Sequence, residues 1–133
     1  TVNDHDKQYV VPIARRLHEM NFAILATEGT ARYLSERGIP AESVLKVYEG
    51  RPNGIDLIVS GQVQLLVNTP FGKLTAHDDH SMRAAALQHA VPYTTTMSAA
   101  SAACDAIIAL KNRRGDVRSL QEWHALAREM ADA

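Results

Sequence analysis

Apolar residues along this chain follow two alternating patterns, which predict two kinds of secondary structure. Short runs rich in apolar and β-branched residues, each bounded by turn residues, are typical of buried strands in a parallel sheet. Longer stretches with an apolar residue at every third or fourth position predict amphipathic helices. The runs cover residues 22–26, 44–48, 63–68 and 91–94, and the helical patterns cover residues 7–20, 31–36, 55–60 and 98–113, a stretch after residue 80 and one after residue 119.

Strands that alternate with helices at short intervals require crossover connections, which give a parallel sheet covered by helices on both faces. The expected fold class is therefore α/β. Asp6 and Thr30 are predicted helix N-caps, Gly38 is predicted to follow a helix end, and Ser119 with Glu122 has the form of a capping box. The last helix is predicted to bury an apolar stripe made of Leu120, Trp123, Ala127 and Met130.

One turn carries a candidate binding site. The run 22–26 is followed by Thr27, a turn through Gly29, and Thr30 at the predicted start of a helix. The first N–H groups of a helix have no partner within it, and here they lie beside two threonine hydroxyls. Such a turn can bind a phosphate or a carboxylate. The same pattern also occurs as an ordinary helix cap, so the other strand ends have to support the site.

Ligands of open α/β sheets bind outside the carboxyl ends of the strands. Cationic, amide and hydroxyl side chains follow several of the predicted strands, which indicates a small anion site at this edge. Taken singly, each of these residues also fits a solvated surface or a simple turn. The residues are Thr27 and Thr30 after the first strand, Lys46 near the second, Asn68 and Thr69 after the third, Thr94 and Thr95 after the last, and Lys7 at the start of the first helix.

Composition narrows the classes of protein. The 133 residues suit one domain. Because 15 acidic residues nearly balance 14 basic ones, the chain lacks the excess of basic charge that would indicate binding to nucleic acid or to a membrane surface. Cys104 is the single cysteine, so no disulfide framework is expected. The single cysteine also indicates a reducing cytoplasm. No apolar run is long enough to predict a membrane span, and the first residues lack a signal-peptide pattern.

A cluster of potential metal ligands, His77-Asp78-Asp79-His80, has a simpler explanation. Acidic residues are favourable at the positive end of a helix dipole, and the cluster precedes a predicted helix. It also lacks a third, well-separated ligand, so no metal is expected.

Four segments, taken in order and with their spacing, resemble a known family. They are Thr27-Glu28-Gly29-Thr30, Lys46-Val47-Tyr48-Glu49-Gly50-Arg51-Pro52, Val67-Asn68-Thr69 and Pro92-Tyr93-Thr94-Thr95. Together they resemble the C-terminal regulatory domain of the large subunit of carbamoyl-phosphate synthase, which has the methylglyoxal-synthase-like fold. Residues 117–124 are similar to the end of that subunit, so the resemblance covers nearly the whole chain.

The resemblance implies a three-layer fold, with a parallel sheet of about five strands flanked by helices. It implies that residues 1–133 form a single regulatory domain excised from the C-terminus of a larger chain. It implies UMP or IMP as effector, with the phosphate held by Thr27 and Thr30 helped by Lys7, Lys46 on phosphate or ribose, and Asn68 on sugar or base. Gly29 and Thr69 complete the implied effector site, and Thr95 is an implied contact to an ornithine site. Pro70 and Glu28 depart from members that have Thr and His there.

The resemblance also implies partners and a parent activity outside these residues. The parent would be a ligase that makes carbamoyl phosphate from bicarbonate, glutamine-derived ammonia and ATP, for pyrimidine and arginine biosynthesis. ATP and Mg are expected only in the synthetase domains of the same large chain. A glutaminase small subunit and a homo-oligomer formed through this domain are the other implied partners. No catalytic residue is implied within the domain.

The alternative is an enzyme of the same fold, methylglyoxal synthase, which acts on dihydroxyacetone phosphate. Asp4-His5-Asp6-Lys7 resembles its Asp-His-x-Lys phosphate loop, and Asp56 falls close to its catalytic Asp. Its catalytic His aligns near Thr75 rather than with His77. A carboxylate base without its positioned acid loses most of the rate, which favours the regulatory interpretation.

Overall fold

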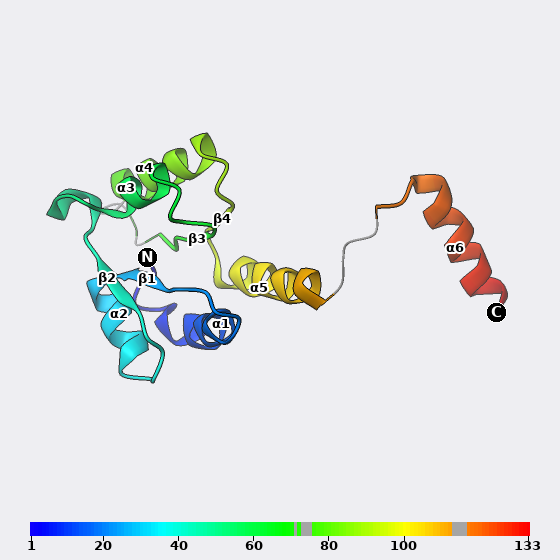
Figure 1. Ribbon diagram of the computed structural model, residues 1–133, viewed down its shortest axis with the longest axis horizontal. Coiled ribbons are helices and arrows are strands. Elements are labelled where there is room, and N and C mark those ends of the chain that lie inside the picture. The colour runs from blue at the N-terminus through cyan, green and yellow to red at the C-terminus, as the bar shows by residue number, and fades with distance from the viewer. Residues whose placement is uncertain (71, 73–75, 113–116) are drawn as a thin grey trace.

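The computed structural model describes residues 1–70, 72, 76–112 and 117–133 (Figure 1). Helices and strands alternate along the chain, as expected for an α/β fold. The α-helices are α1 (Lys7–Glu19), α2 (Glu28–Ser35), α3 (Gly54–Val59), α4 (Ala76–Gln88), α5 (Met97–Asn112) and α6 (Leu120–Asp132), and a 3-10 turn η1 covers Val47–Glu49. The strands are β1 (Leu25–Thr27), β2 (Glu42–Val44), β3 (Leu66–Val67) and β4 (Tyr93–Thr94).

The strands of the described residues form two separate two-stranded parallel sheets, not one sheet of about five strands. β1 pairs with β2 in the register Leu25↔Glu42, and β3 pairs with β4 in the register Leu66↔Tyr93. The parallel pairing was predicted correctly, but the single wide sheet is not observed. Figure 1 shows the N-terminus lying between β1 and β3.

The first residues of the chain lie beside β3 as an extended segment. The Thr1 ammonium donates to the Val67 carbonyl at 2.9 Å, and the Thr69 N–H donates to the Thr1 carbonyl at 3.1 Å. One residue bonding to partners two positions apart is the pattern of a parallel ladder. Thr1 therefore pairs with the edge of β3 opposite β4, whereas the Asn3 N–H bonds to the Thr69 side chain and does not continue the ladder.

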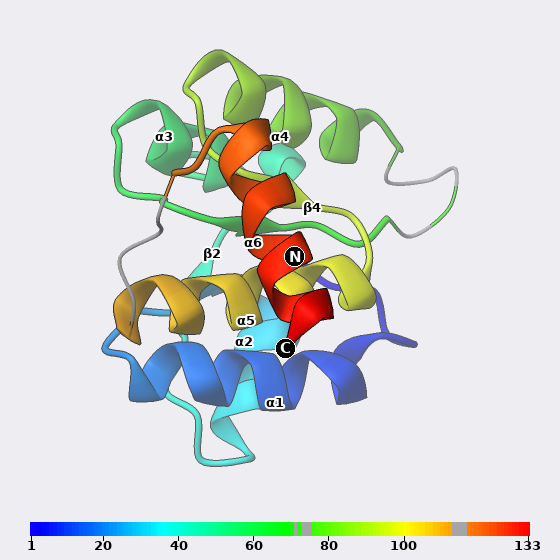
Figure 2. The same cartoon turned by 90° about the vertical axis from the view of Figure 1, so that its right-hand side faces the viewer.

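Three apolar clusters hold the helices to these sheets. One packs α1 against α2, one packs α3 and α4 against β3, and one packs α1 against α5, which lie side by side in Figure 2. Among the described residues, the first and third clusters are linked through the partly buried Ile24, Val67 and Met97. The clusters contain Val2, Val10, Ala14, Leu34 and Ile39; Ile58, Leu66, Ala85, Ala86 and Val91; and Ile13, Leu17, Ala100 and Cys104.

The strands are shorter than the apolar runs that predicted them. Residues 22–24, Val63 and Leu65 are apolar but lie outside the strands, and Lys46 is the N-cap of the η1 turn. The backbone N–H of Lys46 donates to the Glu49 carboxylate at 2.7 Å, which fixes this turn. A run of apolar residues specifies burial, whereas a ladder also needs a neighbouring strand.

The start of α2 also differs from its prediction. The N-cap is Thr27 rather than Thr30, and Gly29 lies in the first turn of the helix. Thr30 is buried, and its hydroxyl donates to the Val2 carbonyl at 3.5 Å. Similarly, α4 begins at Ala76, so the acidic and histidine cluster lies in its first turns instead of before it. Asp6 occupies the N-cap position of α1 without a side-chain cap hydrogen bond.

Helix α6 has the predicted capping box but not the predicted burial. The Glu122 carboxylate accepts from the Ser119 N–H at 2.6 Å, and the Ser119 hydroxyl accepts from the Glu122 N–H at 3.3 Å. The stripe prediction is wrong, because Leu120, Trp123, Ala127 and Met130 are all exposed. Local sequence specifies the helix and its apolar face, but in Figure 1 α6 stands apart from the other elements. Among the described residues, no helix combines the length and apolarity needed to cross a membrane.

Candidate functional site

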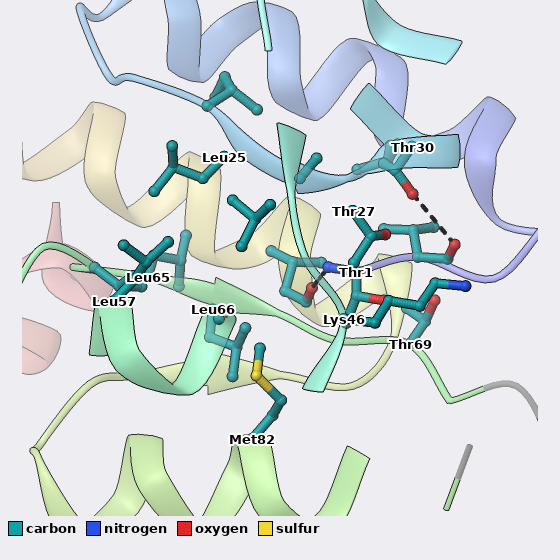
Figure 3. Close-up of a pocket in the computed structure, with 18 of the residues that line it drawn as sticks. Thr1, Leu25, Thr27, Thr30, Lys46, Leu57, Leu65, Leu66, Thr69 and Met82 are labelled. Atoms are coloured by element: carbon teal, nitrogen blue, oxygen red, sulfur yellow. Dashed lines mark hydrogen bonds between the residues drawn. The ribbon is translucent and has the colours of Figure 1, made fainter. Parts of the chain in front are cut away.

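A cavity of about 390 Å³ opens between the two sheets and has two chemically different ends (Figure 3). We call the apolar part between β1 and β3 the body, lined by Leu25, Leu57, Leu65, Leu66 and Met82 among others. We call the polar end at the carboxyl ends of β1 and β3 the mouth. The mouth is lined by Thr1, Asn3, Asp4, Lys7, Thr27, Gly29, Thr30, Lys46, Tyr48, Thr69, Asp78 and Asp79.

Lys7 brings a positive charge to the start of α2. A Cβ added at Gly29 would lie 3.3 Å from the Lys7 Nζ, so the missing side chain of this glycine lets the ammonium approach the first helical turn. A cation beside the positive end of a helix dipole is unfavourable unless an anion lies close to both. Asp4 supplies that anion here, since its carboxylate forms an ion pair with Lys7 at 2.5 Å.

Lys46 lines the same mouth, and its side chain bonds to Tyr48. Its Nζ donates to the Tyr48 hydroxyl at 3.3 Å, and this hydrogen bond, with the nearby acidic groups Glu49 and Asp4, raises the pKa of Lys46. The pKa of Asp4 is lowered, mainly by its hydrogen bond to Lys7 and to a smaller extent by His5 and Lys46. The exposed Asp4 carboxylate is thus paired with Lys7, and Lys46 has only a smaller electrostatic effect on it.

Three of the four threonines that line the mouth, Thr27, Thr30 and Thr69, differ in what their hydroxyls already bind. Thr69 Oγ1 accepts from the backbone N–H of Asn3 at 3.0 Å and from its side-chain amide at 3.2 Å. Thr30 donates to Val2, as described above. Thr27 makes no side-chain cap hydrogen bond, although it occupies the N-cap of α2. Its hydroxyl is therefore the one best placed to meet a ligand at the first turn.

The structure brings most of the predicted site residues to this mouth, namely Lys7, Thr27, Gly29, Thr30, Lys46 and Thr69, but two lie elsewhere. Asn68 is fully buried, and its side-chain amide donates to the Asp79 carbonyl at 3.4 Å. Its Oδ1 and the Thr94 Oγ1 are buried without a hydrogen-bond partner among the described residues. Thr95 is partly exposed beyond the cavity lining.

The prediction of the effector site missed Asp4 and Asn3. Asp4 precedes Lys7 by three residues, and oppositely charged side chains at this spacing near a helix start often pair. The sequence could therefore have predicted the ion pair between Asp4 and Lys7. Asn3 gave no such signal, because its amide reaches Thr69 from the opposite half of the sequence.

Asp56, the candidate base of the enzyme alternative, does not line the cavity. Its carboxylate accepts from the Arg51 guanidinium at 3.0 Å and from the Asn53 N–H at 2.9 Å, and so caps α3. These bonds, chiefly the one to Arg51, lower the pKa of Asp56 and make it a weaker base. Thr75, where the catalytic His would align, lies outside the described residues. Within the described ranges, no three His, Cys, Asp or Glu side chains are grouped to hold a metal ion.

Comparison of the sequence with known proteins shows which family it matches. A model of the family described as "MGS-like domain" matches residues 9–95. Among curated proteins, the chain is 54% identical over 128 residues to a carbamoyl phosphate synthase large chain of Gemmatimonas aurantiaca, covering 96% of this chain. It is 46% identical over 125 residues to a carbamoyl phosphate synthase large chain, C-terminal section, of Methanopyrus kandleri, covering 93% of this chain.

These relatives are much longer than the present chain. The matched region spans 12% of the Gemmatimonas protein and 23% of the Methanopyrus protein. A carbamoyl phosphate synthase large chain of Myxococcus xanthus, 47% identical over 123 residues, likewise matches over 11% of its length.

Proposed function

The chain belongs to the family of MGS-like domains, and we propose that it is the effector-binding regulatory domain of a carbamoyl phosphate synthase large chain. The proposed effector is a nucleoside monophosphate, UMP or IMP. The observation that carries this proposal is the meeting of two lysines, two threonines and the first turn of α2 at one cavity mouth.

The phosphate would bind at the first turn of α2. Its oxygens would accept from the free N–H groups of the turn and from the Thr27 hydroxyl, and the Thr30 hydroxyl would join them by leaving the Val2 carbonyl. The Lys7 ammonium would supply charge from the side left open by Gly29. Lys46 would contact phosphate or ribose from the η1 turn. Thr69 would meet the sugar, and Asn68, buried behind it, would position Thr69 and the end of β3.

The expected affinity suits a reversible sensor. Charge-assisted hydrogen bonds contribute roughly 1.5–3 kcal/mol each, and the mouth offers two or three of them to a phosphate. After the cost of ordering the ligand, the sum corresponds to dissociation constants of about micromolar to millimolar. Displacing the Asp4 carboxylate from its lysines lowers the affinity further.

The regulated activity would lie outside the domain. We propose that the parent chain makes carbamoyl phosphate for pyrimidine and arginine biosynthesis in the cytoplasm, with ATP and Mg bound in its synthetase domains. Effector binding would favour one of two arrangements of the whole protein, sensed by those domains, by a glutaminase small subunit or by a second copy. Thr95, outside the cavity, would face the ornithine-side contact.

Calorimetric titration of the 133-residue chain with UMP, IMP and inorganic phosphate tests the proposal. Lys46→Ala should weaken nucleotide binding by at least about tenfold, because a charge-assisted contact is lost. Lys111→Ala is the matched control, since Lys111 lies on α5 and donates to the Met20 carbonyl. Equal binding by the two variants would refute the placement of the effector.

The enzyme alternative is tested separately with dihydroxyacetone phosphate. Because Asp56 is bonded to Arg51 and lies outside the cavity lining, we expect no formation of methylglyoxal. Turnover that is lost in Asp56→Asn would establish the synthase instead.

A further inference from the structure

We propose that a second cavity, between α1 and α5, binds small organic carboxylates that carry an aromatic or apolar body. We call this cavity of about 360 Å³ the side cavity. The two helices that line it pack against each other and lie side by side in Figure 2. The lining residues are Tyr9, Pro12, Ile13 and Arg16 of α1 and Met97, Ser98 and Ser101 of α5.

The side cavity is distinct from the cavity that holds the mouth and the body. Among the described residues, Ile13 is the only one that lines both. Neither the lysines nor the threonines of the mouth take part in the side cavity. A ligand bound there would therefore be additional to the effector proposed above, and the two proposals stand or fall separately.

Four of the lining side chains provide an apolar wall for the body of a ligand. Ile13 is buried and Met97 is partly buried, so both are already shielded from most of the solvent. Tyr9 is 56% exposed and Pro12 is also exposed, so a ligand that covers them removes further apolar area from water. An aromatic ring suits this wall, because it can pack on the face or the edge of the Tyr9 ring.

Arg16 supplies a positive charge to the side cavity. Its Nη1 donates to the Asp105 carboxylate, and its Nη2 donates to the Ser101 hydroxyl at 3.3 Å. A guanidinium has five N–H donors, and these bonds use two of them. With 33% of its side chain exposed, Arg16 can offer a further pair of N–H groups to a carboxylate in the bidentate arrangement that guanidinium favours.

The other polar groups of the side cavity favour an acid over an amine. The Thr96 hydroxyl accepts from the Ala99 N–H at 3.2 Å and lies 3.2 Å from the Ser98 hydroxyl. When Thr96 donates to Ser98, the Ser98 hydroxyl can donate to a ligand oxygen. Among the described residues that line the side cavity, none is acidic, so an ammonium group would meet Arg16 without a carboxylate beside it.

Asp105 limits the affinity that the side cavity can reach. Its largely exposed carboxylate pairs with Arg16, although Asp105 does not itself line the cavity. A bound carboxylate has to share the guanidinium with Asp105, and two like charges at one arginine repel each other. We therefore expect dissociation constants of about millimolar for a ligand of this size.

The test follows the methionine methyl resonances of the 133-residue chain by NMR. Met97 lines the side cavity and Met82 lines the larger cavity, so their methyl groups report on the two places separately, and Met97→Leu assigns the first resonance. The probe is 3-phenylpropionate. Its controls are 3-phenylpropan-1-ol, which has the same body without charge, and 3-phenylpropylamine, which has the opposite charge.

The acid should shift the Met97 resonance at concentrations at least about fivefold lower than the alcohol, and the amine should bind most weakly. A response to the acid at Met82 alone would place the probe in the larger cavity and overturn the proposal. Equal responses of Met97 to the acid and the alcohol would also overturn it, because Arg16 would then play no part.

Two substitutions test the role of the charge. Arg16→Gln should weaken binding of 3-phenylpropionate about tenfold and leave binding of the alcohol unchanged, which a merely structural change would not do. Arg15→Gln is the matched control, because Arg15 is exposed on the same helix and donates to the Arg37 carbonyl. Equal binding of the acid by these two variants would refute the site.

Asp105→Asn keeps the test decisive if Arg16→Gln does not fold. It leaves Arg16 in place and removes the competing carboxylate, so 3-phenylpropionate should bind a few-fold more tightly. Weaker binding in Asp105→Asn would contradict the assignment of Arg16 as the group that receives the ligand.

Discussion

The mouth and the body of the cavity are lined by the same segments of the chain but differ in how their groups are satisfied. In the mouth, polar groups have partners that can be exchanged: Lys7 holds the exposed Asp4, and Lys46 holds Tyr48. In the body, apolar side chains face one another across a space that no described side chain fills. The polar groups of the mouth can exchange their present partners for a ligand at a small cost in free energy. The apolar body, in contrast, becomes more stable only when its empty space is filled.

The cost of unfilled space differs between the two ends. An unfilled apolar cavity lowers stability by about 24 cal/mol per Å³, and here that cost applies to the apolar body and not to the open, polar mouth. We therefore expect changes in the body to act mainly on stability and changes in the mouth to act mainly on binding.

The largest expected effect comes from deepening the body. Ile58→Ala removes a side chain that is 1% exposed in the cluster of α3, α4 and β3, and should lower the free energy of unfolding by about 3 kcal/mol in urea titrations. Val59→Ala is the matched control on the same helix, 54% exposed, and should change stability by less than about 0.5 kcal/mol. The phosphate affinity of the folded Ile58→Ala variant should stay unchanged. A large loss of phosphate affinity would show that the body also contributes to binding.

The buried Thr1 ammonium should make stability depend on pH. Its folded pKa is about 6 against 8.0 unfolded, so between these values the unfolded chain binds more protons and stability rises with pH. The free energy of unfolding should increase by up to about 3 kcal/mol from pH 6 to 8. N-terminal acetylation should remove this rise. An identical slope in the acetylated protein would show that the amine is solvated.

Gly29→Ala should separate binding from stability at the mouth. The new Cβ would lie 3.3 Å from the Lys7 Nζ, so the ammonium has to move and phosphate affinity should fall by about tenfold. Helix propensity favours alanine by about 1 kcal/mol, so stability should not fall. Ser35→Ala, at the exposed far end of the same helix, should leave affinity unchanged in the same calorimetric titration. Affinity retained in Gly29→Ala would exclude the first turn of α2 as the phosphate site.

Asp4→Asn is expected to have the smallest effect and the opposite sign. Removing the carboxylate frees Lys7 and reduces competition at Lys46, so inorganic phosphate should bind a few-fold more tightly, and more so at low salt. His5→Asn, at the neighbouring exposed position, is the control. Weaker binding in Asp4→Asn would indicate that Asp4 positions Lys7 rather than competing for it.

Sequence reasoning identified the mouth better than the body, for a physical reason. Lys7, Thr27, Thr30 and Lys46 follow helix starts and strand ends, which local patterns and the strand-edge rule both locate. Asn68 and Thr69 were both predicted at the site, and because side chains alternate along an extended segment, only Thr69 lines the mouth while the Asn68 side chain is buried. The contact of Asn68 with sugar or base stays a prediction.

The body could not be predicted, because an apolar run indicates that its residues are buried but does not identify the element against which they pack. Residues 22–24, Val63 and Leu65 carry the composition of strands, yet they lie outside the strands. The prediction that α6 buries its apolar stripe is wrong for the same reason. Periodicity identifies an apolar face, and only the structure shows which surface, if any, lies against it.

The position of Trp123 decides what intrinsic fluorescence can report. It is the single tryptophan of the chain, lies on α6 with 51% of its surface exposed, and has the Arg118 guanidinium 5.7 Å from its ring. Its emission is therefore insensitive to a ligand entering the cavity but responsive to anything that covers α6. A blue shift of that emission on adding a synthetase domain would be a direct optical readout of assembly, obtained without labelling the protein.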